Sequence, residues 1–507
     1  MMQTLSVDHR NHQYQLLQQR FVEQYSPIFT NDLAEKTVVV IPSLTLDQKI
    51  LEALQGAQFY EERLLCLLML LRMPRTRVVY VTSMPIDEII IDYYLHLLPG
   101  VTGFHARQRL TLLSCYDTSL CSLTEKILAR PRLIQRIKAN IKGSELAHLV
   151  CFNETEYEQQ LALALDIPVY GCDPALLYLG TKTGSRLIFK ELNLNLPFGI
   201  ENLHSEAEIA SALLQLKRNN PNLQKAVIKM NDGFSGDGNA IFRFPKYVLD
   251  ATNSLAMIQE LLPQQTTVVA EGLDYANFIQ KFQSMGGIVE EFIEGQIKES
   301  PSVQLRINPL GESEVISTHD QVLGGESGQV FLGATFPANP EYTYEIAAIG
   351  KKVADALQQQ GVLGRFGIDF ISVKEGNTWK HYAIEINLRK GGTTHPFLML
   401  QFLTDGVFDW QKGTYQMPNG QTRYYFASDN VVNEKYKGLC PQDLIDIAHC
   451  NRIQYDGATQ CGVTFHMIGA LSQYGKLGMV CIGRSIAEAQ AYFAKTIDIL
   501  DQESARL

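Results

Sequence analysis

A hairpin with one polar face is encoded between residues 367 and 397, GIDFISVKEGNTWKHYAIEINLRKGGTTHPF. The turn sequence KEGNT at 374–378 separates two β-rich runs. Residues 367–373 and 379–388 are therefore predicted to pair as antiparallel strands.

Four polar side chains converge on one face of this predicted hairpin. Strand side chains alternate between faces, so Glu385, Asn387 and Arg389 share one face of the second strand. If the turn is centred on the glycine of KEGNT, Asp369 lies opposite Ala383 and diagonal to Glu385, on the same face.

Three hard oxygen donors beside a guanidinium are typical of a site for magnesium and phosphate. Oxygen ligands suit Mg²⁺, and the planar Arg fork suits the oxygens of a phosphoryl or acyl-phosphate group. A solvated sheet face with ordinary charges is the alternative. The strongly apolar neighbours favour burial, and a buried carboxylate is costly unless it binds a metal or a cation.

Length and composition predict a multidomain globular protein. The 507 residues exceed one ordinary core, and 46% are hydrophobic and 19% charged. A net charge of -10 without a Lys/Arg block argues against nucleic acid as a partner. The nine scattered cysteines form no C-x-x-C pair, and no apolar run approaches the length of about 20 residues that spans a bilayer. A cytoplasmic protein without membrane contact is predicted.

The pattern along the chain changes near residue 180. Before about residue 175, apolar strands such as VVVIPSLT and RVVYVTS alternate with helices, which is typical of a parallel α/β sheet. Between about 180 and 400, two-residue alternation and Gly-rich turns predict antiparallel hairpins. A Gly- and Pro-containing break at 405–422 precedes a small α+β unit.

A glycine-rich loop follows a predicted strand in AVIKMNDGFSGDGNAIF. Gly233, Gly236 and Gly238 let backbone amides approach a polyphosphate, and Lys229 offers it a positive charge. The loop does not match the Walker pattern, and a strand rather than a helix follows it. A plain Gly-rich hairpin is the alternative.

A third motif, GGIVEEFIEG at 286–295, is an apolar strand interrupted by Glu290 and Glu291. A strand edge that offers a carboxylate and backbone groups can recognise the amino edge of adenine. An edge strand protected by its charges is the alternative.

Taken in chain order, these motifs resemble the ATP-grasp superfamily. The order is Lys182, Lys229 with its glycine loop, the strand with Glu290, Asp369, and the E-x-N-x-R pattern at 385–389. More narrowly, the chain resembles the pheganomycin-type peptide ligase group, in which a pre-ATP-grasp domain precedes the grasp and a small domain follows it. The segments that carry this narrower resemblance are YEERLLCLLMLLR, SPSVQLRINPLG, STHDQVLGGESGQVFLGATFPA and GVTFHMIGALSQYGKLGMVCIG.

The resemblance implies a mixed α/β and α+β multidomain fold. The expected parts are an N-terminal helical segment at 1–35, a Rossmann-like pre-ATP-grasp α/β domain at 36–178, an ATP-grasp nucleotide-binding and catalytic domain at 179–404, and a small C-terminal α+β domain at 405–507.

The resemblance also implies a role for each motif residue, with ATP and Mg²⁺ as the bound groups. The residues expected to contact ATP are Lys182 and Lys229 at the phosphates, Gly233, Ser235, Gly236 and Gly238 in a lid at 231–239, and Glu290, Glu291 and Ile293 at the adenine. The expected magnesium ligands are Asp369, Glu385 and Asn387, and Arg389 is placed near an acyl phosphate. Ile297 stands where many members have a ribose-binding acid, which leaves Gln296 or Glu299 for that contact.

Arg306, in the predicted strand SVQLRI, is a further candidate for the γ-phosphate or a substrate carboxylate. His319, Asp320 and His395 are polar residues in the same region, but a lone histidine is more often structural than catalytic. No general base is predicted from them.

The resemblance implies an ATP-dependent carboxylate-amine, or peptide, ligase. A carboxylate attacks the γ-phosphate of ATP, and an amine then attacks the acyl phosphate to leave an amide, ADP and phosphate. A grasp-fold small-molecule kinase and a non-catalytic ATP-binding regulatory protein are the alternatives. The expected partners are a small carboxylate and an amine, such as an amino acid or short peptide, and the apolar helices of the first domain are compatible with a homodimer.

Overall fold

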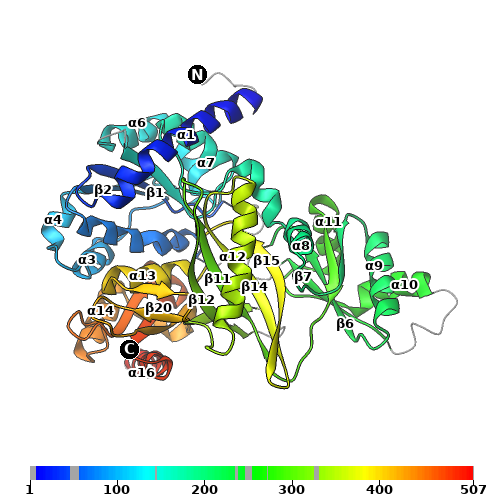
Figure 1. Cartoon of the computed structure of the whole chain (residues 1–507). Coiled ribbons are helices and arrows are strands. Elements are labelled where there is room, and N and C mark those ends of the chain that lie inside the picture. The colour runs from blue at the N-terminus through cyan, green and yellow to red at the C-terminus, as the bar shows by residue number, and fades with distance from the viewer. Residues whose placement is uncertain are drawn as a thin grey trace.

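A computed structural model of the chain describes residues 7–45, 56–142, 146–233, 238–245, 254–270, 272–324 and 330–505. Three sheets organise it, with four, five and nine strands, besides one short two-stranded ribbon. In Figure 1 the N-terminal unit in blue and cyan lies above the orange and red C-terminal region, and the green unit with β6 and β7 projects to one side. Within the described ranges, no helix is long and apolar enough to cross a bilayer.

The first sheet is parallel, in the order β3-β2-β1-β4. Its strands are β1 (Lys36–Ile41), β2 (Thr76–Thr82), β3 (Leu110–Ser114) and β4 (Ala147–Cys151). Its helices are α1 (Val7–Thr30), η1 (Ala57–Arg72), α3 (Glu88–His96), α4 (Gly103–Arg107), α5 (Leu123–Leu128), α6 (Pro131–Asn140) and α7 (Glu156–Leu165). Strands β1 and β4 are buried along their whole length, as the continuous apolar runs predict. The predicted N-terminal helix is present as α1, and Phe21 on it stacks on His148 of β4.

The second sheet is antiparallel, in the order β5-β9-β6-β7-β8, and has its own apolar core. Its strands are β5 (Gly199–Leu203), β6 (Lys225–Met230), β7 (Asn239–Arg243), β8 (Thr266–Val268) and β9 (Gly287–Glu291). The helices of this region are η3 (Pro174–Gly180), α8 (Lys182–Glu191), α9 (Glu206–Asn219), α10 (Ser254–Gln265) and α11 (Tyr275–Met285).

The third sheet has nine antiparallel strands, and β15 pairs with β14 beside the path β10-β14-β11-β12-β13-β18-β20-β19. Its strands are β10 (Lys298–Glu299), β11 (Pro301–Ile307), β12 (Ser313–Gly324), β13 (Val330–Phe336), β14 (Gly364–Glu375), β15 (Thr378–Asn387), β18 (Tyr424–Val432), β19 (Gly462–His466) and β20 (Lys476–Gly483). The other elements are α12 (Thr343–Gln359), α13 (Thr394–Thr404), the ribbon of β16 (Val407–Asp409) and β17 (Thr414–Gln416), η4 (Glu434–Gly438), α14 (Pro441–Cys450), η5 (Ile468–Ala470), α15 (Leu471–Tyr474) and α16 (Ile486–Ser504).

The nine-stranded sheet continues across residue 405. Ala334, Thr335 and Phe336 of β13 pair with residues 425–427 of β18, so the C-terminal strands extend the sheet that holds β14 and β15. The domain boundary predicted between residues 404 and 405 does not coincide with the end of a sheet. It stays a prediction. Because the sheet is continuous, the C-terminal region has a fixed position beside the predicted site.

The predicted hairpin at 367–388 is present as β14 and β15, but its register differs from the expectation. A bulge between Asp369 and Phe370 in the ladder inserts one extra residue on β15, so Asp369 pairs directly with Glu385 and Phe370 pairs with Ala383. The expected pairing of Asp369 with Ala383 is therefore wrong, because the partner of Asp369 is Glu385. A β-bulge re-aims the side chains beside it, and here it sets the two carboxylates directly opposite each other on adjacent strands.

The 3-10 helix η1 joins the first sheet to the C-terminal region. The main-chain N–H of Gly469 donates hydrogen bonds of 3.1 and 3.2 Å to the two carboxylate oxygens of Glu62. Burial raises the pKa of Glu62 to about 8. This buried acid therefore links two segments that are about 400 positions apart in the sequence.

We expect Glu62→Gln to change the pH dependence of stability. The pKa of Glu62 is about 8 in the folded chain against an ordinary value of 4.5, so between these pH values the folded state keeps a proton that the unfolded state has lost. The free energy of unfolding should fall as the pH rises through this window, by at most about 1.4 kcal/mol per pH unit from this residue. Urea unfolding at several pH values should show a shallower decline for Glu62→Gln than for wild type or for the exposed control Glu23→Gln. Parallel curves for all three proteins would contradict this role of Glu62.

Candidate active site

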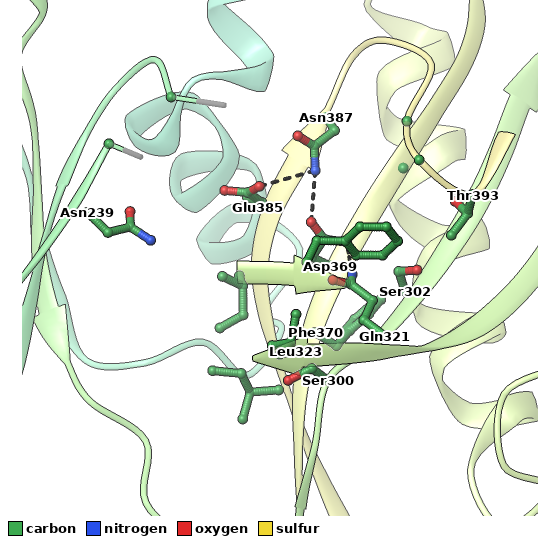
Figure 2. Close-up of a pocket in the computed structure, with 18 of the residues that line it drawn as sticks. Asn239, Ser300, Ser302, Gln321, Leu323, Asp369, Phe370, Glu385, Asn387 and Thr393 are labelled. Atoms are coloured by element: carbon green, nitrogen blue, oxygen red, sulfur yellow. Dashed lines mark hydrogen bonds between the residues drawn. The ribbon is translucent and has the colours of Figure 1, made fainter. Parts of the chain in front are cut away.

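A cavity of about 530 Å³ lies between the five-stranded and the nine-stranded sheets. It collects residues from β6, β7 and β9 on one side and from β11, β12, β14 and β15 on the other. Figure 2 shows Asn239 of β7 facing Glu385 and Asn387 of β15 across this space. Two sheets that close on one cavity form a cleft suited to an extended ligand.

The polar centre of the cleft consists of Asp369, Glu385 and Asn387. The amide Nδ2 of Asn387 donates to Asp369 Oδ2 at 2.9 Å and to Glu385 Oε1 at 3.2 Å, as the dashed lines in Figure 2 show. The Nε2 of Gln321 on β12 donates to the other oxygen of Asp369 at 2.7 Å. Burial raises the pKa of Asp369, and Lys182 and Arg389 act in the opposite direction. The three predicted oxygen donors are therefore brought together.

Lys182 is the first residue of α8, and its Nζ forms an ion pair with Glu385 Oε2. Its side chain is largely buried. Burial, and next the charge of Lys229, lower the pKa of Lys182 to about 7. A negatively charged phosphate beside this nitrogen would favour its protonated form again, so Lys182 is suited to phosphate binding.

Lys229 belongs to a buried row of alternating charges. Glu290 is 2% exposed, and its two oxygens accept from Lys229 Nζ and Arg186 Nη1, each at 2.6 Å. Arg186 also donates from Nε to Glu201 at 2.7 Å. Glu290 and Lys229 both line the cleft, and the Glu290 carboxylate also fixes the position of the Lys229 ammonium group.

Arg389 lines the cleft just beyond the end of β15. Its Nη1 donates to the main-chain oxygen of Lys390 at 3.1 Å. Burial lowers the pKa of Arg389 to about 10, while Asp369 acts to raise it and Arg63 acts to lower it. The Arg389 guanidinium is therefore close enough to interact electrostatically with Asp369 and with Arg63.

Most of the remaining predicted ATP contacts also line the cleft. Glu291, Ile293, Gly233 and Gly238 line it, together with Phe292. Ser235 and Gly236, which were predicted in the lid, lie outside the described residues. Of the segment expected to contact ribose, Lys298 and Ser300 line the cleft, whereas Ile297, Gln296 and Glu299 are not among its lining residues.

Arg306 is not brought to the cleft, and this corrects its expected role. It lies on β11 opposite Arg365, and its Nη2 donates to Glu314 at 2.6 Å. Ser302 and Gln304 of the same strand do line the cleft. Arg306 is on the same face of the strand as Ser302 and Gln304, because side chains alternate between faces. A strand advances about 3.3 Å per residue, and Arg306 therefore lies beyond the end of the cavity.

The other polar residues considered from the sequence have structural partners. His319 is fully buried, and its Nε2 is 2.6 Å from the Tyr425 hydroxyl. Asp320 accepts from the hydroxyl of Tyr342 at 2.6 Å, and His395 Nδ1 is 2.8 Å from the main-chain oxygen of Arg63. Each of these side chains therefore has a partner within the protein.

The donor set fits a magnesium ion bound together with phosphate oxygens. In the part of the chain that the structure describes, no group of three or more His, Cys, Asp and Glu residues could hold a metal by itself. Mg²⁺ is commonly held by one or two carboxylates plus substrate phosphates and water. Asp369 and Glu385 supply the carboxylates, and the amide oxygen of Asn387 is the third donor.

Several residues that line or support the cleft were not predicted from the sequence. Gln321 supports Asp369, and Arg186 supports Glu290. A second group lines the end of the cleft beyond Arg389 and comprises Tyr60, Arg63, Asp429, Asn430 and Lys476. The local sequences YEER at 60–63 and SDN at 428–430 do not indicate that these residues lie close together in the fold. Their proximity depends on contacts between segments that are distant in the sequence.

Comparison with known families supports the class of fold. Residues 174–265 and 251–411 match the family described as IQCH-like, ATP-grasp, and residues 443–496 match the PGM1 C-terminal domain. Biotin carboxylase from Campylobacter jejuni is 12% identical, with a TM-score of 0.56 over 92% of this chain and 91% of its own. N5-carboxyaminoimidazole synthetase from Staphylococcus aureus is 11% identical, with a TM-score of 0.51 over 92% of this chain and 98% of its own. Residues 174–411 of this chain therefore match an ATP-grasp family, and the superfamily predicted from the sequence is confirmed for this region.

Two curated relatives narrow the resemblance. The L-propargylglycine--L-glutamate ligase of Streptantibioticus cattleyicolor is 28% identical over 465 residues, which cover 90% of this chain and 92% of that protein. The IQ motif-containing protein H of Danio rerio is 23% identical over 521 residues, which cover 93% of this chain and 49% of that protein. The chain therefore matches the first relative over nearly its whole length and spans about half of the second. Within the superfamily, the resemblance to peptide ligases is confirmed.

We expect Glu290→Gln to weaken nucleotide binding at least about tenfold. The substitution removes the charge that holds Lys229, and a hydrogen bond to a charged group contributes about 1.5–3 kcal/mol. Calorimetric titration with Mg-ADP measures the effect. The matched control is Glu294→Gln, in the same segment, whose more exposed side chain lies 3.4 Å from Lys225. Equal dissociation constants for the two folded variants would contradict the role of Glu290.

Proposed function

We propose that the chain is an ATP-dependent ligase that joins a small-molecule carboxylate to an amine through an acyl phosphate. The observation that carries this proposal is the convergence of Lys182, Lys229, the Asp369 centre and Arg389 on one cleft. The ligase class is supported by the relative named as an L-propargylglycine--L-glutamate ligase, which matches the chain over 90% of its length. The products would be an amide, ADP and phosphate.

The proposed reaction has two displacements. An oxygen of the donor carboxylate attacks the γ-phosphorus of ATP, the bond to the β-phosphate oxygen breaks, and ADP leaves. The nitrogen of the amine then attacks the acyl carbon, phosphate leaves, and the nitrogen loses a proton. No covalent attachment to the enzyme is needed, so catalysis rests on positioning and on the neutralisation of charge.

The cleft residues have distinct tasks in this scheme. Lys182 and Lys229 would bind the phosphates, since both ammonium groups face the cleft. Asp369, Glu385 and Asn387 would hold magnesium, which neutralises phosphate charge when it is bound. For that contact Asn387 would present its amide oxygen in place of the Nδ2 that now faces the carboxylates. Arg389 would stabilise the charge that develops on the acyl phosphate.

The test is to supply Mg-ATP with pairs drawn from an amino-acid panel and to identify products by mass spectrometry, alongside an assay for released ADP. An amide product that depends on both substrates supports ligation. A phosphorylated hydroxyl compound would instead identify a kinase, and nucleotide binding without turnover across the panel would identify a regulatory protein.

We expect Glu385→Gln and Asn387→Ala each to lower turnover at least about a hundredfold, because each removes a group that would stabilise charge during phosphoryl transfer. Both variants should keep the far-ultraviolet circular dichroism spectrum of the wild type. The control is Glu375→Gln, an exposed position in the same hairpin. Wild-type activity in either cleft variant would sink the assignment of the metal site.

A further inference from the structure

The end of the cleft beyond Arg389 is built from segments that are distant in the sequence. Tyr60 and Arg63 come from η1, Asp429 and Asn430 from β18, and Lys476 from the start of β20. We call these five residues the distal group. They bring charges of both signs to the cavity that Lys182 and Lys229 also line.

Arg63 and Asp429 form the most buried charged pair of the distal group. Arg63 Nη2 is bound to Asp429 Oδ2, and the two side chains are 10% and 12% exposed. The guanidinium also lies over the ring of Tyr60, 4.0 Å from its centroid. The Nε of Arg63 is buried, and no hydrogen-bond partner for it is present in the described ranges. This guanidinium therefore has donor capacity that its present contacts do not use.

Lys476 approaches the same tyrosine from strand β20. Its Nζ lies 3.1 Å from the Tyr60 hydroxyl and 5.2 Å from the ring centroid. Both cations thus contact one aromatic ring, and among the residues that the structure describes an acidic partner is present for Arg63 but not for Lys476. The ammonium of Lys476 has three donor positions, and a hydroxyl occupies one of them.

The distal group is connected to the proposed reaction centre. Arg63 is near enough to Arg389 to contribute to lowering its pKa. The loop that follows Arg389 lines the space between them with Gly391, Gly392, Thr393 and Thr394. Gln304 of β11 fixes this loop, because its Nε2 donates to the main-chain oxygen of Thr393 at 2.8 Å. A ligand held by the distal group would therefore extend along this loop toward Arg389.

We propose that the distal group binds the zwitterionic head group of an α-amino acid that is one of the two substrates. Its carboxylate would bind Arg63 and Lys476, and its ammonium would bind Asp429. A site with charges of both signs suits a zwitterion. Two cations alone would suit an anion, and a carboxylate alone would suit an amine. This inference rests on the proposed ligase function and adds to it the residues that would bind an amino-acid substrate.

A free amino acid suits the distal group better than a peptide, because a peptide separates its free ammonium and carboxylate by at least one amide unit. Two roles remain for the amino acid within this proposal. A donor with a second carboxylate would extend that group to Arg389, and an acceptor would extend a side-chain amine. The position of the new amide bond in the product distinguishes the two.

Direct binding provides the first test. Each of the twenty standard L-amino acids is titrated by calorimetry into the full chain with Mg²⁺ and a non-hydrolysable ATP analogue. The tightest binder is then compared with its N-acetyl form and its α-carboxamide form. We expect each blocked form to bind at least about tenfold more weakly, because each loses one charge-assisted contact. Blocked forms that bind as well as the free amino acid, or a lack of binding by all twenty, would overturn the proposal.

Variants provide the second test. Lys476→Gln and Asp429→Asn should each raise the dissociation constant for that amino acid by about tenfold or more, and leave the constant for the ATP analogue within about twofold. Lys476→Gln is the more conservative change, since it leaves the buried Arg63–Asp429 pair intact. Lys351→Gln, in a partly exposed pair with Asp355 on α12, is the matched control. Unchanged amino-acid binding in both cleft variants would contradict the proposed contacts.

The outcomes separate this inference from the proposed ligase function. Amide formation by the wild type, combined with unchanged amino-acid binding in Lys476→Gln and Asp429→Asn, would retain the ligase and remove the distal site. Amino-acid binding that depends on both residues, without amide formation from any pair, would retain the site and remove the ligase.

Discussion

Buried charge that must be compensated is the constraint on which the cleft depends. Asp369 and Glu385 lie opposite each other in one strand pair, where two ionised carboxylates repel and have lost solvation. Asn387 donates to both of them, Lys182 pairs with Glu385, and Gln321 donates to Asp369. The protein thus holds the acidic centre together with its own donors, and a bound cation would substitute for part of this network.

The same constraint organises the phosphate side of the cleft. Glu290 lies between Lys229 and Arg186, so each buried cation has an acidic partner. An ammonium in such a row is held in one orientation, which lowers the conformational entropy lost when a phosphate binds. Glu290 therefore has two functions: it lines the cavity, and it neutralises and orients Lys229 and Arg186.

Continuity of the nine-stranded sheet explains why the C-terminal region contributes to the site. Strand β18 pairs with β13, and β20 pairs with β18, so Asp429 and Lys476 are fixed relative to β14 and β15 through backbone hydrogen bonds. The 3-10 helix η1 reaches the same place from the N-terminal unit and is tied to the C-terminal region by Glu62. Three regions of the chain therefore define the distal end of one cavity.

The sequence by itself determined the local units of this protein. The alternation of side chains in β15 and the short turn before it predicted that Glu385, Asn387 and Asp369 would meet, because these relationships act over a few residues. Only the tertiary structure decided the bulge that sets Asp369 opposite Glu385, the end of β11 at which Arg306 lies, and the arrival of Arg63, Asp429 and Lys476 at the cleft. The physical reason is that periodicity specifies the face of a strand, whereas register, the extent of a cavity and contacts between distant segments depend on how the sheets pack.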